Sequence, residues 1–416
     1  MSDTLTRKNR RYVISFSLAG FVALFLAIAP VLDPYILAEF GSSVTLRVND
    51  VFAIILALLC FCKRVGFPKN KILLQLCLGM TLISLISMLG VSNANVVNQI
   101  KVLLIWFIYA FLVSYIWNTE CRETFFRIAE VIALFAIAIL LIQFVLGNIG
   151  VSVWDGKIPL FNLSKYDGWA GYIDPNTGDI RPNSIFQEPS YFGIYILVLF
   201  AHAISNNRIK LALLYAISTV LTTSLVAVLG MIIITMYYLM TKADSKGEKK
   251  TKRRVLFLVI LFICIFLYLY NTNDYIYQLV EYIFKRVGGI QTDLHSTRMG
   301  STRWRLMGNI NLFSRYTTWQ KLFGYGTLQY ASIFGVVNYS SNFVNVILNY
   351  GIIGLVLFVV WLARIFIGLT KNRKIFFWVM IIIFAVDQQW FSWYFFYLLS
   401  ACVLLSKEKK GDMANE

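Results

Sequence analysis

Long apolar runs separated by short polar segments make up most of this chain. Within bilayer hydrocarbon a spanning segment must satisfy its own backbone hydrogen bonds, which leaves a helix of about 20 apolar residues or a closed barrel of strands. The runs are uninterrupted and too long for barrel strands, so they predict membrane-spanning helices. About twelve spans are expected, several of them short, at residues 12–32, 44–62, 72–91, 100–117, 128–147, 191–205, 209–222, 225–241, 255–270, 343–365, 375–387 and 390–405.

Basic residues occur in short clusters between the apolar runs. These clusters lie at residues 7–11, 63–71, 122–127, 208–210, 242–254, 364–374 and 407–410. With an even number of spans and a cytoplasmic N-terminus, every cluster falls on the cytoplasmic side, as the positive-inside rule requires. Both termini are then expected to be cytoplasmic.

Two connections are much longer than ordinary loops, and both fall on the side opposite the basic clusters. They cover residues 148–190, roughly 40 residues, and 271–342, roughly 70 residues. The prediction is a single all-α, multi-pass membrane domain over residues 1–416, with function located in these two loops. The helical hairpin at 209–222 and 225–241 is barely long enough to cross twice, so a tilted or partly re-entrant hairpin is the alternative there.

Composition supports a membrane protein and excludes other classes. The 416 residues are 58% hydrophobic and 14% charged, whereas about a quarter of the residues of a soluble domain are charged. The formal net charge of +17 does not indicate nucleic-acid binding, because the Lys and Arg residues lie in short clusters that set topology. The six cysteines lie mainly in apolar runs and predict neither a disulfide framework nor a metal site.

The outer loops carry more cations than topology favours. These cations are Arg181, Lys285, Arg286, Arg298, Arg303, Arg305, Arg315 and Lys321. Guanidinium groups are suited to bidentate phosphate binding, so an anionic partner near the outer headgroups is expected. The alternatives are binding to lipid headgroups, or pairing with Asp274, Glu281 and Asp293 of the same loop.

Both loops contain patterns of their own. In the second loop, apolar residues at helical spacing predict two amphipathic helices on the membrane, one at 275–283 and one at 306–313, before a turn at Gly324-Tyr325-Gly326. That turn either reverses the chain or lets its backbone approach a ligand. The first loop is rich in aromatic residues, and sugar stacking and an interfacial aromatic belt explain this equally well; they are Trp154, Tyr166, Trp169 and Tyr172.

Four short motifs carry a resemblance to a known family. They are RPNSIFQEPSYFG at 181–193, STR at 301–303, FGYG at 323–326, and the run from Asn342 that ends in NYGIIG at 349–354. Together with the topology of the whole chain, they resemble O-antigen polymerases of the Wzy type, within the family of bacterial polysaccharide polymerases and O-antigen ligases. Such polymerases are also described by an Arg, ten residues and a Gly in each outer loop. Arg315 to Gly326 has this spacing, whereas Arg181 to Gly193 is one residue longer.

The resemblance favours a polymerase over a ligase at one position. Ligases usually carry a His eleven residues before the first Gly of the last motif, where this chain has Ser340. Asn349 likewise stands where an acidic residue is common.

The resemblance implies a GT-C-like helical enzyme of the bacterial inner membrane, with its active site on the periplasmic side. Such an enzyme moves a growing glycan from undecaprenyl diphosphate onto the terminal sugar of a lipid-linked repeat unit, by inverting, metal-independent transfer without a cofactor. The lipid-linked oligosaccharide is both donor and acceptor. Further expected partners are membrane lipid, a chain-length regulator and a flippase.

Residue roles follow from the same resemblance together with the chemistry of a diphosphate leaving group. Arg181 and Arg303 are expected nearest the diphosphate, with Arg298, Arg305 and Arg315 as further ligands. Glu188 is expected to orient or deprotonate the acceptor hydroxyl, and its alternative is a salt bridge to Arg181 that only shapes the site. Asp387 could also orient an arginine. The residues assigned to the substrate-binding loop motif are Gly324, Tyr325, Gly326, Ser340 and Asn342.

Three other functions remain as alternatives. A flippase for lipid-linked sugar would carry its cations in a cavity among the spans, whereas the spans here are expected to be nearly free of charge. An O-antigen ligase is the alternative within the enzyme class. A structural scaffold would not need so cationic an outer loop. The two histidines do not decide the matter, because His202 is expected to be structural and His295 is a weak candidate base.

Overall fold

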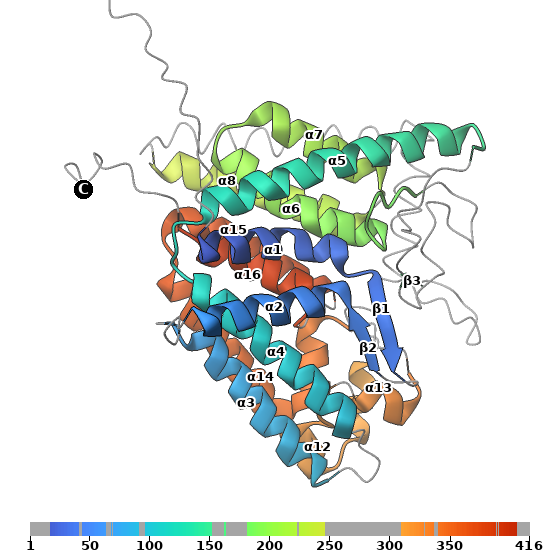
Figure 1. Cartoon of the computed structure of the whole chain (residues 1–416), viewed down its shortest axis with the longest axis vertical. Helices are drawn as coiled ribbons and strands as arrows, with labels where there is room; N and C mark the ends of the chain where they lie inside the picture. The colour runs from blue at the N-terminus through green and yellow to red at the C-terminus, as the bar shows by residue number, and fades with distance from the viewer. Residues whose placement is uncertain are drawn as a thin grey trace, which may run out of the picture.

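The computed structural model describes residues 17–40, 44–63, 68, 70–90, 96–151, 162–163, 181–222, 224–245, 309–327, 329–336, 340–387, 389 and 391–405. Its elements are α1 (Leu18–Leu32), β1 (Tyr35–Phe40), β2 (Val44–Arg47), α2 (Val48–Cys62), α3 (Ile72–Met88), α4 (Val96–Ile116), α5 (Arg122–Asn148), β3 (Asn162–Leu163), α6 (Pro189–Ser205), α7 (Ile209–Leu221), α8 (Leu225–Ser245), η2 (Ile310–Arg315), α12 (Thr318–Phe323), α13 (Gln329–Phe334), α14 (Asn342–Gly368), η3 (Lys371–Arg373), α15 (Lys374–Val386) and α16 (Trp393–Val403). Figure 1 shows the helices packed in one bundle, with the strands at one end.

The helices agree closely with the predicted spans. Each span that falls on described residues overlaps one helix, from α1 to α16, and the span at 255–270 lies outside the described residues. Three helices are long and apolar enough to cross a membrane, namely α4 through Gln99–Ile116, α5 and α14. The other apolar helices have between 10 and 17 residues. A membrane-compatible helical architecture is therefore confirmed, while twelve spans stay a prediction.

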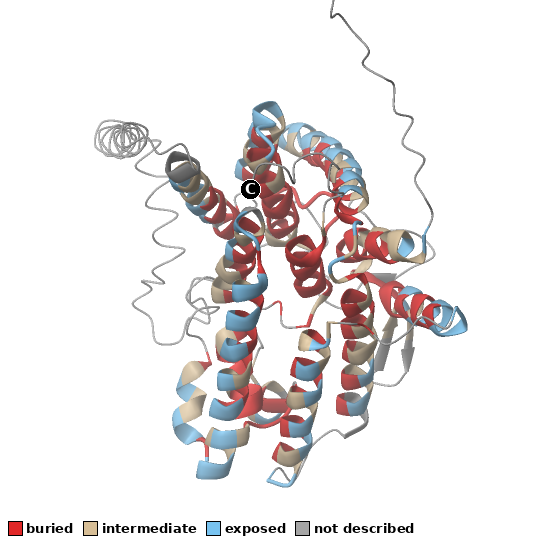
Figure 2. Ribbon diagram, turned by 90° about the vertical axis from the view of Figure 1, so that its left-hand side faces the viewer, coloured by how far each residue is buried: buried red, intermediate tan, exposed pale blue. Residues whose placement is uncertain are grey.

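The outside of the bundle is apolar and its centre is fully covered. Large apolar side chains of α5, including Val131, Phe135 and Val145, are exposed, as expected for a surface that faces lipid. By contrast every residue of α16 and most residues of α6 are buried, and Figure 2 shows that buried residues gather toward the middle of the bundle while exposed ones lie on its outer faces. Helices α6 and α16 therefore form the centre of the bundle.

A small antiparallel sheet follows α1. The strand order is β2-β1-β3, so the hairpin of β1 and β2 brings the end of α1 beside the start of α2. The prediction of a short turn after residue 32 and a span from residue 44 was wrong here, because Val44–Arg47 pairs with β1 and α2 begins at Val48. We call the end of the bundle with this sheet the sheet end, and the end where α4 stops and α5 starts the opposite end.

Helix α14 contains a break inside its length. Gly351 has φ 66° and ψ −165°, which only glycine adopts readily. The break leaves carbonyl groups without helical partners, and two of them accept hydrogen bonds from another segment. Tyr325 donates its backbone N–H to Leu348 O at 3.3 Å, and Gly326 donates to Asn349 O at 2.8 Å. Irregular backbone within the bundle is tolerated here because it is buried and paired.

The Gly324-Tyr325-Gly326 turn packs directly on this break. A Cβ at Gly324 would collide with the backbone of Asn349, and a Cβ at Gly351 with the backbone of Leu322. The glycines therefore permit a close approach of two backbones. The expectation of a sharp turn is confirmed, and the partner that the turn approaches is α14.

Two arginines close the opposite end. Arg122 donates to Ala401 O at 3.2 Å and to Leu404 O at 3.3 Å, and Arg373 donates to Val403 O at 3.3 Å. The last carbonyl groups of a helix lack intrahelical donors, so these guanidinium groups cap the short helix α16.

Candidate active site

The segment 181–188 enters the central helix α6 and is fixed to α5. Ser184, at φ 58°, donates its backbone N–H to Gln143 Oε1 at 2.7 Å, and Gln143 Nε2 donates back to Ser184 O at 3.2 Å. The Ser184 hydroxyl also donates to Ala136 O at 2.5 Å. These contacts hold Arg181, which is buried, and Glu188, which is half-buried, at the two ends of one short docked segment.

Glu188 is the N-cap residue of α6 and Pro189 is its first helical residue. Ser190 donates its hydroxyl to Glu188 Oε2 at 3.0 Å. A negative charge is favourable at a helix N-terminus because it interacts with the helix dipole and the free N–H groups. The carboxylate is thus held in place at the sheet end, at the start of α6.

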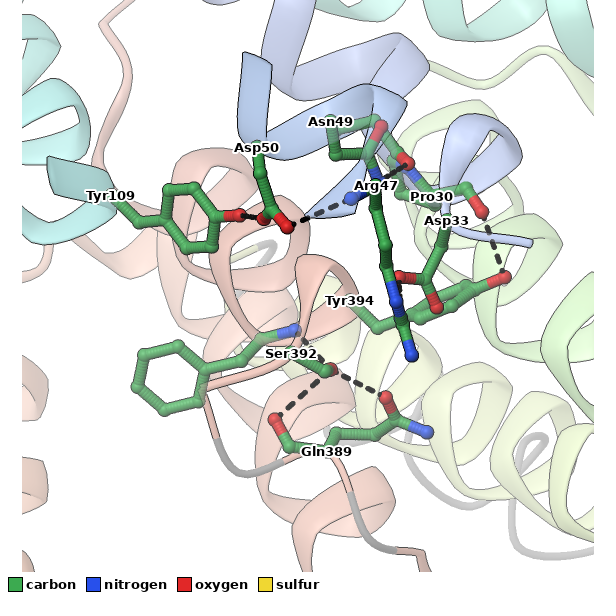
Figure 3. A network of polar contacts seen from close by, with 11 residues as sticks. Pro30, Asp33, Arg47, Asn49, Asp50, Tyr109, Gln389, Ser392 and Tyr394 are labelled. Atoms are coloured by element: carbon green, nitrogen blue, oxygen red, sulfur yellow. Dashed lines mark hydrogen bonds and ion pairs between the residues drawn. The ribbon is translucent and has the colours of Figure 1, made fainter. Parts of the chain in front are cut away.

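A second set of charged residues lies where the β-hairpin joins α2. The Arg47 guanidinium forms an ion pair with Asp33, and the Asp33 carboxylate raises the pKa of Arg47 above its ordinary value. Arg47 also donates its backbone N–H to Asp50 Oδ2 at 3.1 Å, and Tyr109 donates its hydroxyl to Asp50. Helices α1, α2 and α4 therefore all contribute to this network, which is drawn in Figure 3.

Tyr394 interacts with residues of both sets. Its hydroxyl donates to Pro30 O at 3.3 Å, and its ring lies 5.0 Å from that of Tyr191. Asp33 and Glu188 both interact electrostatically with Tyr394. The ion pair of Asp33 and the carboxylate at the start of α6 therefore both lie near one buried tyrosine.

The network continues to α14 through the segment before α16. Ser392 donates its hydroxyl to Gln389 Oε1 at 2.7 Å, and Gln389 donates its backbone N–H to Asn342 Oδ1 at 2.6 Å. In Figure 3 the Arg47 side chain runs past Tyr394 toward the Gln389 carboxamide. Polar groups from six helices, α1, α2, α4, α6, α14 and α16, are thus gathered at the sheet end of the bundle.

The predicted site residues fall into separate places. Arg181 and Glu188 are on one segment at the sheet end, and Asn342 joins the network through Gln389. Arg315 is exposed at the end of η2. Arg298, Arg303, Arg305, the predicted helix at 275–283 and the aromatic residues of the first loop lie outside the described residues.

The remaining motif residues pack in the loop region around α12 and α13. Ser340 is buried and lies 3.3 Å from Asn309 Nδ2 and 3.5 Å from the Tyr330 hydroxyl, both within hydrogen-bonding reach. Tyr325 belongs to a small apolar cluster with Tyr316, and burial raises the pKa of both phenols. Within the described part of 306–313, the predicted amphipathic helix is a 3-10 helix, η2, rather than an α-helix.

Sequence reasoning missed Asp33, Arg47, Asp50 and Tyr109. It also expected the spans to be nearly free of charge, and one exception, Asp50, is buried within α2. A signal was present in the sequence. The stretch YILAEF, then GSS, then VTLR shows two short β-type runs joined by turn residues, which predicts a hairpin and places Arg47 at its end.

His202 lies away from this site. Its ring stacks on Phe126 at 3.8 Å, and its Nε2 lies 3.8 Å from Glu130, which is paired with Arg208 at the opposite end. These contacts agree with the expectation of a structural role.

The geometry provides guanidinium groups, one carboxylate at a helix N-terminus and a buried phenol, all between apolar helices. Such a site can bind an anion and accept a proton from a hydroxyl group. Within the described ranges, no group of three or more His, Cys, Asp or Glu side chains is placed to hold a metal ion. No protein-family model and no curated protein matches this chain.

Proposed function

We propose that this protein is a bacterial inner-membrane glycosyltransferase that polymerises polysaccharide from repeat units linked to a polyprenyl diphosphate. The observation that carries the proposal is the meeting of Arg47–Asp33 and the Arg181–Glu188 segment at the sheet end of an apolar helix bundle. The lipid part of the substrate would pack against the apolar helices, and its diphosphate would bind the arginines. The resemblance of residues 181–193 to polymerases provides independent support.

The reaction we propose is a single displacement. The hydroxyl of the acceptor sugar attacks the anomeric carbon of the donor glycan, and the bond from that carbon to the diphosphate oxygen breaks. The electron pair of this bond remains on the diphosphate, where Arg181 and Arg47 stabilise the developing charge. Glu188 accepts the proton from the attacking hydroxyl. Inversion at the anomeric carbon follows because the hydroxyl enters opposite the leaving group.

We propose that this chemistry takes place outside the cytoplasm. Helix α1 ends at the sheet end, so a cytoplasmic N-terminus would put the sheet end on the periplasmic side. A lipid-linked unit in the outer leaflet could then present its diphosphate beside Arg47 while its lipid remains against exposed apolar faces.

A deletion strain that expresses variants from a plasmid tests this function. Arg181→Ala and Arg303→Ala, at unchanged protein level, should abolish long-chain polysaccharide on a gel. In a strain whose product is O-antigen, the deletion should leave one repeat unit on the lipopolysaccharide core. A normal ladder from both variants would contradict the proposal, and a core without any repeat unit would indicate a ligase or a flippase instead.

The second candidate function is a flippase, because some charged side chains lie close to the helices of the bundle. Arg47, Asp50 and Lys101 interact with one another between α2 and α4, which is where a transporter of an anionic lipid would hold charges. Accumulation of lipid-linked repeat units distinguishes the two functions. Units that accumulate in the outer leaflet of the deletion strain support the polymerase, whereas units confined to the inner leaflet support the flippase.

A further inference from the structure

The first two turns of α14 present three asparagines on one buried side. Asn342, Asn345 and Asn349 follow one another at spacings of three and four residues, and their side chains are 0%, 0% and 1% exposed. A helix face buried to this degree is normally apolar. Together with Gln389, whose backbone N–H donates to Asn342 Oδ1, we call these residues the carboxamide face.

Four polar atoms of this face are buried without a hydrogen-bond partner in the described part of the chain. Three are amide donors, Asn342 Nδ2, Asn345 Nδ2 and Gln389 Nε2, and the fourth is the acceptor Asn349 Oδ1. Buried side-chain amides are almost always paired in folded proteins, so a group of unpaired ones requires a partner.

Capping of the helix does not account for these residues. Ser341 already provides the N-cap of α14, with its hydroxyl accepting from Val344 N at 3.5 Å. The contacts within the face are few, namely those from Asn349 Nδ2 to Asn345 and from Gln389 N to Asn342. The other amide atoms therefore remain available to a ligand.

The carboxamide face adjoins the candidate active site. Gln389 accepts a hydrogen bond from Ser392, the N-cap of α16, two residues before Tyr394. Figure 3 shows the Gln389 carboxamide below Tyr394, on the side toward which the Arg47 side chain points. From Asn342 the face extends along α14 for about 10 Å to Asn349. A ligand held by Arg47 could therefore continue along it.

The chemistry of the face selects an uncharged ligand rich in hydroxyl groups. Its four side chains are all neutral carboxamides, which offer donors and acceptors together, as sugar hydroxyls do. A phosphate group would instead be recognised by guanidinium groups. Buried amides also discriminate strongly between sugars, because a sugar that lacks the matching hydroxyl group leaves the amides without a hydrogen-bond partner.

We propose that the carboxamide face is a glycan subsite that binds hydroxyl groups of a neutral sugar next to the diphosphate. The proposal deepens the proposed function and rests on it for the link between this sugar and a lipid diphosphate. The subsite determines which repeat unit is accepted, while Arg47 and Arg181 bind the part that all such substrates share.

Calorimetric titration of the purified full-length protein in nanodiscs tests the subsite without any turnover. The probe is the free repeat-unit oligosaccharide, released by mild acid from the lipid-linked intermediate of the deletion strain. We expect Asn345→Leu to weaken its binding at least tenfold. Ser114→Ala is the matched control, because Ser114 is also buried with an unpaired hydroxyl but lies near the end of α4, at the opposite end of the bundle; this variant should bind as the wild type does.

Two additions keep the outcome unambiguous. Asn345→Ser repeats the test with a smaller change should the leucine variant fail to fold, and undecaprenyl diphosphate without sugar should bind equally well to both variants and the wild type. The subsite is overturned if the wild type and the Asn345 variants bind the oligosaccharide equally well, or if the wild type does not bind it. The unpaired amides would then bind water only. Asn345-dependent binding without polymerase activity keeps the subsite and overturns the proposed function.

Discussion

Arginines at the two ends of the bundle have partners of different kinds. At the opposite end, Arg122 donates to backbone carbonyls of α16, and its guanidinium lies 4.9 Å from the Phe126 ring and 4.5 Å from the Phe376 ring. At the sheet end, Arg47 is paired with the Asp33 side chain and is 34% exposed. A guanidinium that satisfies backbone carbonyls supports the fold, whereas one paired with a carboxylate can exchange this partner for an anionic ligand.

An ion pair alone does not mark a functional site. Arg208 and Glu130 form such a pair at the opposite end, on the surface beside His202. The pairs differ in their surroundings, because Asp33 of the Arg47–Asp33 pair interacts with the buried Tyr394, and Glu188 interacts with the same tyrosine. Variants at the opposite end therefore serve as controls for variants at the sheet end.

The largest effect is expected at Glu188. Glu188→Gln removes the proton acceptor but keeps the size of the side chain, so the turnover rate should fall roughly 1,000-fold. Initial rates of polymer formation by purified enzyme measure this. A variant that keeps more than a tenth of the wild-type rate would assign Glu188 to shaping the site only, as the N-cap of α6.

Arg47→Ala should lower the turnover rate about 100-fold, because one donor to the leaving diphosphate is lost. The matched variant Arg208→Ala breaks an ion pair at the opposite end and should leave the rate unchanged. Its effect on unfolding free energy should stay below about 1 kcal/mol, as for other exposed pairs. Equal rates in both variants would remove the distinction between the two ends.

Arg122→Leu should affect stability rather than chemistry. Loss of the bonds to Ala401 O and Leu404 O leaves buried carbonyls unpaired, and two ring contacts are lost as well. The expected cost is about 2–4 kcal/mol of unfolding free energy. Thermal unfolding in detergent should show a lower Tm, and the rate per folded molecule should equal that of the wild type. A stable but inactive Arg122→Leu would place function at the opposite end too.

Ser340→Ala should have the smallest effect. Its contacts with Asn309 and Tyr330 are long, at 3.3 and 3.5 Å, so their loss should cost less than about 1 kcal/mol. Polymer length on a gel should not change. Shorter polymer from this variant would show that the loop around α12 and α13 contacts the substrate, which would extend the site beyond the sheet end.

The sequence predicted the helices well because long apolar runs leave few other structures in a membrane. It could not predict the β-hairpin from the same argument, since Val44–Arg47 continues into the apolar run of α2 and reads as part of it. The break in α14 could not be predicted from the sequence either. NYGIIG identifies a glycine at residue 351, but the segment that satisfies the freed carbonyls lies more than twenty residues earlier in the chain.

The candidate site was predicted only where its residues share one motif. Arg181 and Glu188 lie in a single stretch, so their proximity could be inferred from the sequence. Asp33 and Arg47 are brought together by the β-hairpin between them, whereas Tyr394 comes from a distant part of the chain and reaches this pair only because α1 and α16 pack together. Contacts of this kind depend on tertiary packing, which short motifs do not encode.

The most direct test of the account is a reaction in nanodiscs between the purified protein and the lipid-linked repeat unit taken from the deletion strain. The account predicts a ladder of polymer with wild type and with Arg208→Ala, and none over the same period with Arg47→Ala or Glu188→Gln. A wild-type protein that leaves the repeat units unjoined, or an Arg47→Ala variant that polymerises them at the wild-type rate, would contradict it.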